Sequence, residues 1–321
     1  WRAATDLSGP NATYGDWLAY EPTDARYISV AYYALDARYM AAMSRAIDRA
    51  DRAAHYDSLF EQVRDHFRRI YCNAEGDLNP EVRTQTGYLL ALRNDLLLPE
   101  RRPAAVAALK QKIIDNGYKL STGFVGSCIL NEVLAEFGEN NLAYSLLLQT
   151  ENPSWLYSVH QGATTIWERW NSYTKATGFG DVGMNSFNHY AYGAVQEWMY
   201  RHIAGIETTE QAPGFAHPIL QPKPDTRSAE EIPAGQEKIT WVRTSFASPV
   251  GLIESAWDMT DGFTYTCRVP VAGHLHLPLI GNAETLVVNG VAHKPDEFKL
   301  CPVGKGVTIE LAPGAYTFEQ K

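Results

Sequence analysis

The 321-residue sequence predicts a multidomain protein in which an all-α region is followed by an antiparallel β-sandwich. Up to Gly205, apolar residues recur every three or four positions, as on amphipathic helices. Beyond about residue 219 they alternate with polar residues, as on half-buried strands. A proline-rich run at 213–224 separates the two patterns, so we expect domains at 1–212 and 213–321.

Two long helices open the all-α region and form a predicted αα-hairpin. The first begins near Ile28 and the second near Tyr56. In each, large apolar residues recur at helical spacing, and we expect them to face the core. These residues are Tyr32, Leu35, Tyr39, Met43 and Ile47 in the first helix, and Tyr56, Leu59, Phe60, Val63, Phe67 and Ile70 in the second.

Shorter helices follow, each ended by a glycine or proline. They are predicted at 88–96, before Pro99, at 103–117, at 125–137, at 142–148, and at 190–203, before Gly205. Proline at a helix start and glycine just past a helix end are typical of helix boundaries. The count is seven or eight helices, with almost no strand pattern between them.

The C-terminal region carries hairpin patterns. From Phe263 to Val269 apolar and polar residues alternate, and apolar alternation returns at 307–311 and 316–318. Asp261-Gly262 and Asn289-Gly290 are dipeptides that favour two-residue β-hairpin turns. This region therefore predicts the β-sandwich.

Composition limits the partners that the chain can have. With 45% hydrophobic and 20% charged residues it predicts a packed core, and its net charge of −9 argues against nucleic acid or an anionic membrane surface as partner. No apolar run is long enough to span a membrane. Residues 1–6 lack a signal-peptide pattern, which slightly favours a cytoplasmic over a secreted protein.

The cysteines and one pair of histidines are the residues that a metal site would use. Four cysteines lie far apart without a CxxC pair, so we expect buried reduced thiols. His274 and His276 lie on one face of a strand but lack an evident third ligand. We therefore expect neither a metal nor an organic cofactor. The cysteines are Cys72, Cys128, Cys267 and Cys301.

Aromatic rings gather around one carboxylate at 153–190. Glu168 lies between Trp167 and Trp170, in a weakly solvated setting that suits proton transfer near neutral pH. Tryptophan rings also offer flat apolar faces to the C–H groups of a sugar, and Trp17 and Trp155 lie in similar loops. The segment predicts carbohydrate chemistry, although tryptophans of this kind also pack in cores.

Five segments together carry a resemblance to a known family. They are 15–18 (Gly-Asp-Trp-Leu), 121–126 (Ser-Thr-Gly-Phe-Val-Gly), 153–155 (Pro-Ser-Trp), 162–170 (Gly-Ala-Thr-Thr-Ile-Trp-Glu-Arg-Trp) and 188–190 (Asn-His-Tyr). With them the chain resembles the bacterial α-L-rhamnosidases from about Tyr14 onward. That resemblance implies a partial (α/α)6 toroid of helical hairpins followed by the β-sandwich, and hydrolysis of terminal α-L-rhamnosides with inversion.

The resemblance also implies roles for single residues. Glu168 would be the general base, and His189 and Trp17 would contact rhamnose. The family's general acid lies in a segment that the 321 residues do not contain, so we expect it upstream of Trp1. The expected partners are a rhamnose-containing glycoside or oligosaccharide and either the N-terminal hairpins or further copies of the chain.

Plainer alternatives remain open for each residue. Glu168 could form an ion pair with Arg169 or Arg201, and His189 could be a hydrogen-bonded structural histidine. Asp16 could cap the helix that follows it or bind a sugar hydroxyl. For the whole chain, the rivals are a toroidal glycosidase or lyase acting on another sugar and a catalytically silent sugar-binding or structural fragment.

Overall fold

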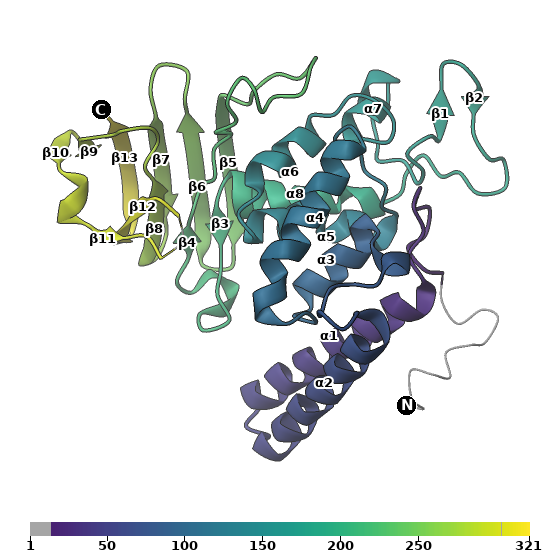
Figure 1. The fold of residues 1–321 in the computed structure, drawn as a ribbon. Helices are drawn as coiled ribbons and strands as arrows, with labels where there is room; N and C mark the ends of the chain where they lie inside the picture. Colours follow the sequence, from purple (N-terminus) through teal and green to yellow (C-terminus); the bar gives the residue numbers. More distant parts are fainter. Residues whose placement is uncertain (1–13, 303) are drawn as a thin grey trace. The chain divides into compact units, whose positions relative to one another are not determined.

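The computed structural model describes residues 14–302 and 304–321 and divides into two compact units, 1–194 and 195–321 (Figure 1). The order predicted from the sequence, helical hairpins followed by largely antiparallel β-sheets, is confirmed. The domain boundary between 212 and 213 stays a prediction. Residues 1–6, on which the expected localisation rests, lie outside the described residues. No helix of the described chain is long and apolar enough to cross a membrane.

The first hairpin consists of α1 (Ala25–Ala46) and α2 (Ala50–Tyr71), which lie side by side in Figure 1. Asp24 caps α1, because its carboxylate accepts the backbone N–H groups of Arg26 and Tyr27 at 2.7 and 3.0 Å. Tyr27 is fully buried, with its ring centroid 5.0 Å from that of Phe67 on α2. The predicted αα-hairpin is therefore confirmed.

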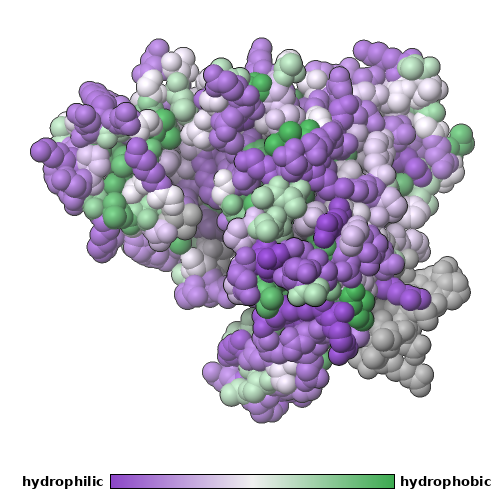
Figure 2. Space-filling model, in the orientation of Figure 1, coloured by the Kyte–Doolittle hydropathy of each residue, from purple (hydrophilic) through white to green (hydrophobic). Residues whose placement is uncertain are grey.

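The face of α1 that packs inward was predicted wrongly. Tyr32, Tyr39, Met43 and Ile47 are 37–69% exposed, and only Leu35 of the predicted stripe is buried. Short side chains fill the buried face instead, because alanines allow neighbouring helices to approach closely. On the face shown in Figure 2, hydrophobic patches are small and separated by hydrophilic residues. The short buried residues of α1 include Val30, Ala31, Ala34, Ala37 and Ala41.

The next helices agree with the predicted spacing. They are α3 (Gln85–Arg93), α4 (Arg102–Asp115), α5 (Phe124–Glu136) and α6 (Asn140–Leu147), with short 3₁₀ turns at Pro80–Val82 and Pro99–Arg101. Gly117 follows the end of α4 with a φ of +69°, the conformation expected of a residue just past a helix.

Two helical segments differ from the prediction. The sequence did not predict α7 (Trp155–His160), whose six residues are too few for a periodic pattern; the Ser154 hydroxyl caps it by accepting the Tyr157 N–H at 3.1 Å. The helix predicted at 190–203 is instead a 3₁₀ turn (Ala191–Ala194), the short α8 (Val195–Trp198) and a π turn (Met199–Ile203).

The second unit is a β-sandwich of two sheets. Strand order is β10-β9-β13-β7-β6-β5 in the six-stranded sheet and β11-β12-β8-β4-β3 in the five-stranded sheet, where β4 and β8 alone are parallel. Side chains that alternate along the strands fill its core. The strands are β3 (Ile206–Glu207), β4 (Ile219–Leu220), β5 (Trp241–Ser248), β6 (Gly251–Asp258), β7 (Thr264–Val269), β8 (Gly273–Pro278), β9 (Leu286–Val288), β10 (Val291–His293), β11 (Lys299–Leu300), β12 (Gly306–Leu311) and β13 (Gly314–Gln320).

The turn at Asn289-Gly290 is confirmed as a two-residue hairpin connection. Val288 and Val291 pair across it, and the φ angles of +48° and +85° at the two turn residues are those of the tight primed turn that suits twisted strands. The sequence did not predict the hairpin of β5 and β6, which are the two longest strands of the six-stranded sheet.

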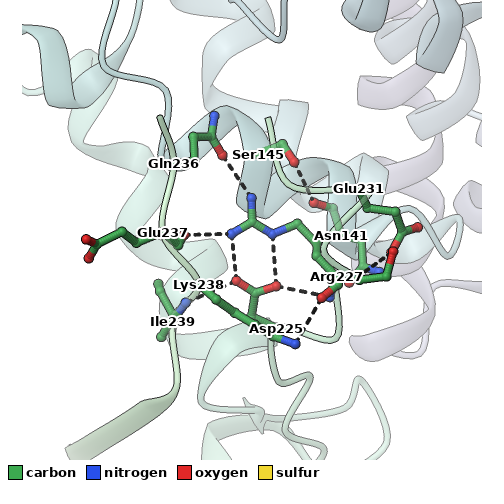
Figure 3. A network of polar contacts seen from close by, with 10 residues as sticks. Asn141, Ser145, Asp225, Arg227, Glu231, Gln236, Glu237, Lys238 and Ile239 are labelled. Carbon is green, nitrogen blue, oxygen red and sulfur yellow. Dashed lines mark hydrogen bonds and ion pairs between the residues drawn. The ribbon is translucent and has the colours of Figure 1, made fainter. Parts of the chain in front are cut away.

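A buried ion pair holds the irregular segment before β5 (Figure 3). The side chains of Asp225 and Arg227 are both fully buried, and the guanidinium donates to the carboxylate through Nε at 2.9 Å and Nη2 at 2.7 Å. Further donors and acceptors surround the pair: Arg227 Nη1 donates to Gln236 Oε1 at 2.8 Å, and the Ile239 N–H donates to Asp225 Oδ2 at 3.1 Å. These contacts hold the segment from 225 to 239 in place although it forms neither a helix nor a strand.

All four cysteines are free thiols. The prediction that they are buried holds for Cys267 and is wrong for Cys72, Cys128 and Cys301, which are half-buried. Burial raises the pKa of the Cys267 thiol to about 12 and that of Cys72 to about 11.

Candidate active site

Asp16 ties the loop before α1 to the start of α5. Its carboxylate accepts the backbone N–H groups of Gly123, Val125 and Gly126 at 2.8, 2.8 and 3.1 Å, and the Thr86 hydroxyl also donates to it. The side chain is only 6% exposed, and burial raises the pKa of Asp16 by more than these hydrogen bonds lower it. Four donors occupy the carboxylate, so Asp16 caps a helix and does not present its oxygens to a sugar hydroxyl. The alternative named the wrong helix: Asp16 caps α5, whereas the helix that follows it in the chain is α1.

The same loop holds Trp17 against α5. The Trp17 carbonyl accepts the Phe124 N–H at 3.0 Å. A Cβ atom on Gly123 would lie 2.1 Å from that carbonyl oxygen, so only glycine permits this approach. The Trp17 ring is half-buried and meets the exposed Tyr14 ring edge to face, with centroids 5.6 Å apart. Part of the indole is therefore open to a ligand.

Glu168 lies on a long irregular segment, 161–190, whose only strands are β1 (Tyr173–Thr174) and β2 (Gly178–Phe179). Its backbone N–H donates to the Ser186 carbonyl at 2.9 Å, and the Ser186 N–H donates to its Oε2 at 2.8 Å. Among the described residues the other oxygen, Oε1, has no hydrogen-bond partner, although the residue is only 7% exposed. One carboxylate oxygen is thus anchored and the other is available.

The ion-pair alternative for Glu168 is not what the structure shows. Arg169 donates through Nε to the Met184 carbonyl at 2.7 Å and lies 3.5 Å from the Asp181 carboxylate. Arg201 forms ion pairs with Glu197 and Glu207. No ion pair involves Glu168 within residues 14–302 and 304–321.

His189 lies on a segment that pairs with the segment carrying Glu168. Its N–H donates to the Ile166 carbonyl at 2.9 Å, two residues from Glu168, and its ring centroid lies 4.8 Å from that of Phe124. The Ala191 N–H donates to Nδ1 at 3.2 Å, so the proton of the neutral ring is on Nε2. Half-buried in this way, His189 can donate to a ligand through Nε2.

Phe124 therefore connects the predicted residues, and the sequence reasoning did not single it out. Its backbone holds Trp17 and its ring contacts His189, while two backbone hydrogen bonds pair the segment 166–168, which carries Glu168, with the segment 186–189, which carries His189. The structure brings Trp17, Glu168 and His189 into one connected group. Only the motif 121–126 could have indicated Phe124 from the sequence.

The three other predicted tryptophans are core rings. Trp155, Trp167 and Trp170 are 7%, 6% and 4% exposed. Trp170 stacks on Tyr192 at 3.7 Å between centroids, and the Trp155 indole N–H donates to the Tyr192 carbonyl at 2.8 Å. They do not present open faces to a sugar as the sequence suggested; they form the packed layer that supports the site. Loop position misled the prediction, because these loops fold inward.

The histidine pair gains a neighbour in the fold but not a metal site. His217 Nε2 and His274 Nδ1 lie 2.7 Å apart, and the His274 and His276 rings are parallel with centroids 6.5 Å apart. In the described part of the chain, no group of three His, Cys, Asp or Glu residues is arranged to hold a metal ion.

A cleft of about 770 Å³ opens elsewhere in the first unit. Tyr20, Arg83, Tyr88 and Lys112 line it, and none of Trp17, Glu168 and His189 does. The presence of an open cleft would therefore, by itself, point away from Glu168. We place the candidate active site at Glu168 because a buried carboxylate with one oxygen anchored and the other without a described partner is a more specific feature than an open polar cleft.

Comparison with known proteins decides the family. The profile of the bacterial α-L-rhamnosidase six-hairpin glycosidase domain matches residues 2–203, and the profile of the α-L-rhamnosidase C-terminal domain matches 205–293. The chain belongs to the bacterial α-L-rhamnosidases. Its helical unit and its β-sandwich thus correspond to two consecutive domains of that family.

Individual family members agree. An α-L-rhamnosidase of Formosa agariphila is 35% identical over 96% of this chain and 33% of its own length, and one of Streptomyces avermitilis is 38% identical over 82% of the chain and 24% of its own length. The crystal structure of the Streptomyces avermitilis α-L-rhamnosidase complexed with L-rhamnose has a TM-score of 0.82 at 32% identity, over 96% of this chain and 28% of that one. The chain spans about a third or less of the length of these relatives.

Proposed function

We propose that this chain supplies the water-activating half of an inverting α-L-rhamnosidase and part of its rhamnose pocket. Glu168 carries the proposal. Its Oε2 is held by the Ser186 N–H at 2.8 Å, and its Oε1 has no partner in the described chain, as a group that takes a proton from water requires. Its 7% exposure keeps competing bulk water away.

Inverting hydrolysis needs two carboxyl groups on opposite sides of the bond that breaks. The general acid protonates the departing glycosidic oxygen, while the base removes a proton from the water that attacks the anomeric carbon; the two groups lie about 6.5–9.5 Å apart. Glu168 is the proposed base. Because the chain spans 28% of a solved relative, we propose that the acid belongs to a further part of the protein.

His189 and Trp17 are the proposed sugar contacts. The His189 Nε2–H can donate to a rhamnose hydroxyl, since Nδ1 is already occupied by the Ala191 N–H. The exposed part of the Trp17 ring can pack against the C–H face of the sugar. Asp16, Trp155, Trp167 and Trp170 then act through the fold, by fixing the loop and the layer behind these two side chains.

The test measures both turnover and binding. Against a chromogenic α-L-rhamnoside, Glu168→Gln should lower kcat about 10²–10⁴-fold, the usual contribution of a general base. Glu75→Gln, at an exposed turn, is the matched control and should change nothing. Undiminished turnover in the Glu168 variant would contradict the assignment.

A chain that lacks the acid can still bind the sugar. Calorimetry with L-rhamnose then replaces turnover as the measurement: His189→Ala should weaken binding about twofold to tenfold, as the loss of one hydrogen bond does. Rhamnose binding without turnover, both in the chain alone and in the chain combined with the part of the protein that carries the acid, would favour the sugar-binding alternative. No rhamnose binding at all would count against a rhamnose pocket.

A further inference from the structure

The cleft away from Glu168 has the features of a second binding site. It has a volume of about 770 Å³, within the range of roughly 300–1,000 Å³ that small-molecule sites occupy. Its walls come from the loop 20–21, the start of α3 and the C-terminal half of α4. It lies wholly within the first unit.

Tyr88 gives the cleft a fixed hydroxyl that the protein does not use. The residue is 8% exposed, so its ring is held by packing. Its hydroxyl has no hydrogen-bond partner among the described residues, although it lines the cleft. A tyrosine hydroxyl is protonated at neutral pH, and burial raises the pKa of Tyr88 further, so the group can donate. The hydroxyl is open to the cleft, so a ligand there can bond to it.

Arg83 adds a second oriented donor to the cleft. Its Nε donates to the Leu78 carbonyl at 2.7 Å, which sets the plane of the guanidinium. Its two terminal amino groups have no partner within residues 14–302 and 304–321. Arg83 and Tyr88 both line the cleft, and together they offer it several donors.

The remaining charges balance one another. Lys112 Nζ lies 2.7 Å from Glu21 Oε1, and the Asp115 carboxylate accepts from the Gln111 amide at 2.7 Å. Two cations, Arg83 and Lys112, thus face two anions, Glu21 and Asp115. A cleft with no net charge does not select an anion. Its mixture of fixed donors and acceptors suits a ligand whose hydroxyls both donate and accept.

Tyr20 provides an apolar surface in the same cleft. It is 49% exposed, and its hydroxyl donates to Asn152 Oδ1 at 2.9 Å, which fixes the orientation of the ring. A fixed, half-exposed ring can pack against the C–H face of a sugar while the hydroxyls reach the polar walls. Both kinds of contact that a sugar needs are therefore present.

We infer that this cleft is a second carbohydrate site, which binds a neutral oligosaccharide of two or three sugar units. Tyr20 packs against one sugar ring, and Tyr88 and Arg83 hydrogen-bond to its hydroxyls. The inference goes beyond the proposed function and does not depend on it. The loop 15–21 joins the two sites, because Trp17 bonds to Phe124 at one end and the Glu21 N–H donates to the Ser121 carbonyl, at 3.0 Å, at the other.

The test uses Tyr88→Phe, which removes only the unused hydroxyl. Binding of maltotriose, cellotriose and trigalacturonic acid to the chain is measured by calorimetry. None of these contains rhamnose, so binding at the proposed active site should not contribute to the measured heat. At least one neutral trisaccharide should bind, and Tyr88→Phe should weaken it about threefold to tenfold without lowering the melting temperature. Tyr39→Phe, on an exposed part of α1, is the matched control and should leave binding unchanged.

Three results would overturn the inference. The first is that neither neutral trisaccharide binds at millimolar concentration, and the second is that only the trigalacturonate binds. The third is binding that survives both Tyr88→Phe and Tyr20→Ala but is lost in His189→Ala, because the ligand would then occupy the proposed active site. Loss of trisaccharide binding in Tyr20→Ala, with rhamnose binding retained, would support the second site.

Discussion

The substitution Asp16→Asn should destabilise the first unit far more than its small chemical change suggests. The carboxylate accepts three backbone N–H groups of α5 and the Thr86 hydroxyl, and it is 6% exposed. An amide of the same shape replaces one acceptor oxygen by an NH₂ group that points at donors. With the NH₂ group toward Thr86, whose hydroxyl can accept from it, the bond from Gly123 is lost; in the other orientation the bonds from Val125 and Gly126 are lost. At least one buried N–H is therefore left without its acceptor, and the remaining bonds lose the negative charge that strengthens them.

The size of the effect follows from these contacts. Each hydrogen bond to a charged group contributes about 1.5–3 kcal/mol, and the losses are not additive. We therefore expect the free energy of unfolding to fall by about 3–5 kcal/mol, as when one member of a buried charged network is removed. Rhamnose binding should weaken as well, because the loop that carries Trp17 is no longer fixed.

Asp24→Asn is the matched control. Asp24 also caps a helix, but a single oxygen accepts both N–H groups, and asparagine caps about as well as aspartate. Its expected cost is below about 0.5 kcal/mol. Denaturant unfolding followed by tryptophan fluorescence compares the two variants. A cost at Asp16 as small as that at Asp24 would refute the assignment of Asp16 as the anchor of α5.

Three further predictions concern single groups. Gly123→Ala would place a Cβ atom 2.1 Å from the Trp17 carbonyl oxygen, so we expect about 1–3 kcal/mol of destabilisation by thermal melting and weaker rhamnose binding by calorimetry. Asp225→Asn leaves the Arg227 guanidinium buried without its counter-charge, and denaturant unfolding should show a loss of about 3–5 kcal/mol. The Cys267 thiol, with its pKa raised to about 12, should resist iodoacetamide at pH 8 until the protein unfolds, as judged by peptide mass mapping.

Much of the fold was predictable because it rests on local patterns. The helical spacing from Ile28 to Phe137 and the Asn289-Gly290 turn are properties of short stretches of sequence. Burial is not local. Periodicity favoured Tyr39 and Met43 for the inner face of α1, whereas packing buried the alanines, since helices approach most closely where side chains are short.

The candidate site shows the same limit. The motif 162–170 drew attention to Glu168, and 188–190 to His189, and their roles stay predictions. The motifs could not show that Asp16 bonds to Gly123 and Gly126, which follow it in the sequence by more than a hundred positions. Nor could they show that Trp155 and Trp170 fold inward around Tyr192. Contacts between distant segments depend on the whole chain, and no short pattern records them.

The irregular course of 161–190 has a consequence for how this protein can change over evolutionary time. Glu168 and His189 are held by backbone pairing with Ser186 and Ile166, outside the long helices that supply most of the buried surface. Exchanges at the exposed positions of this stretch can reshape the surroundings of these two side chains at little thermodynamic cost. A change in the specificity of the proposed sugar pocket would therefore need no compensating second mutation in the helical core.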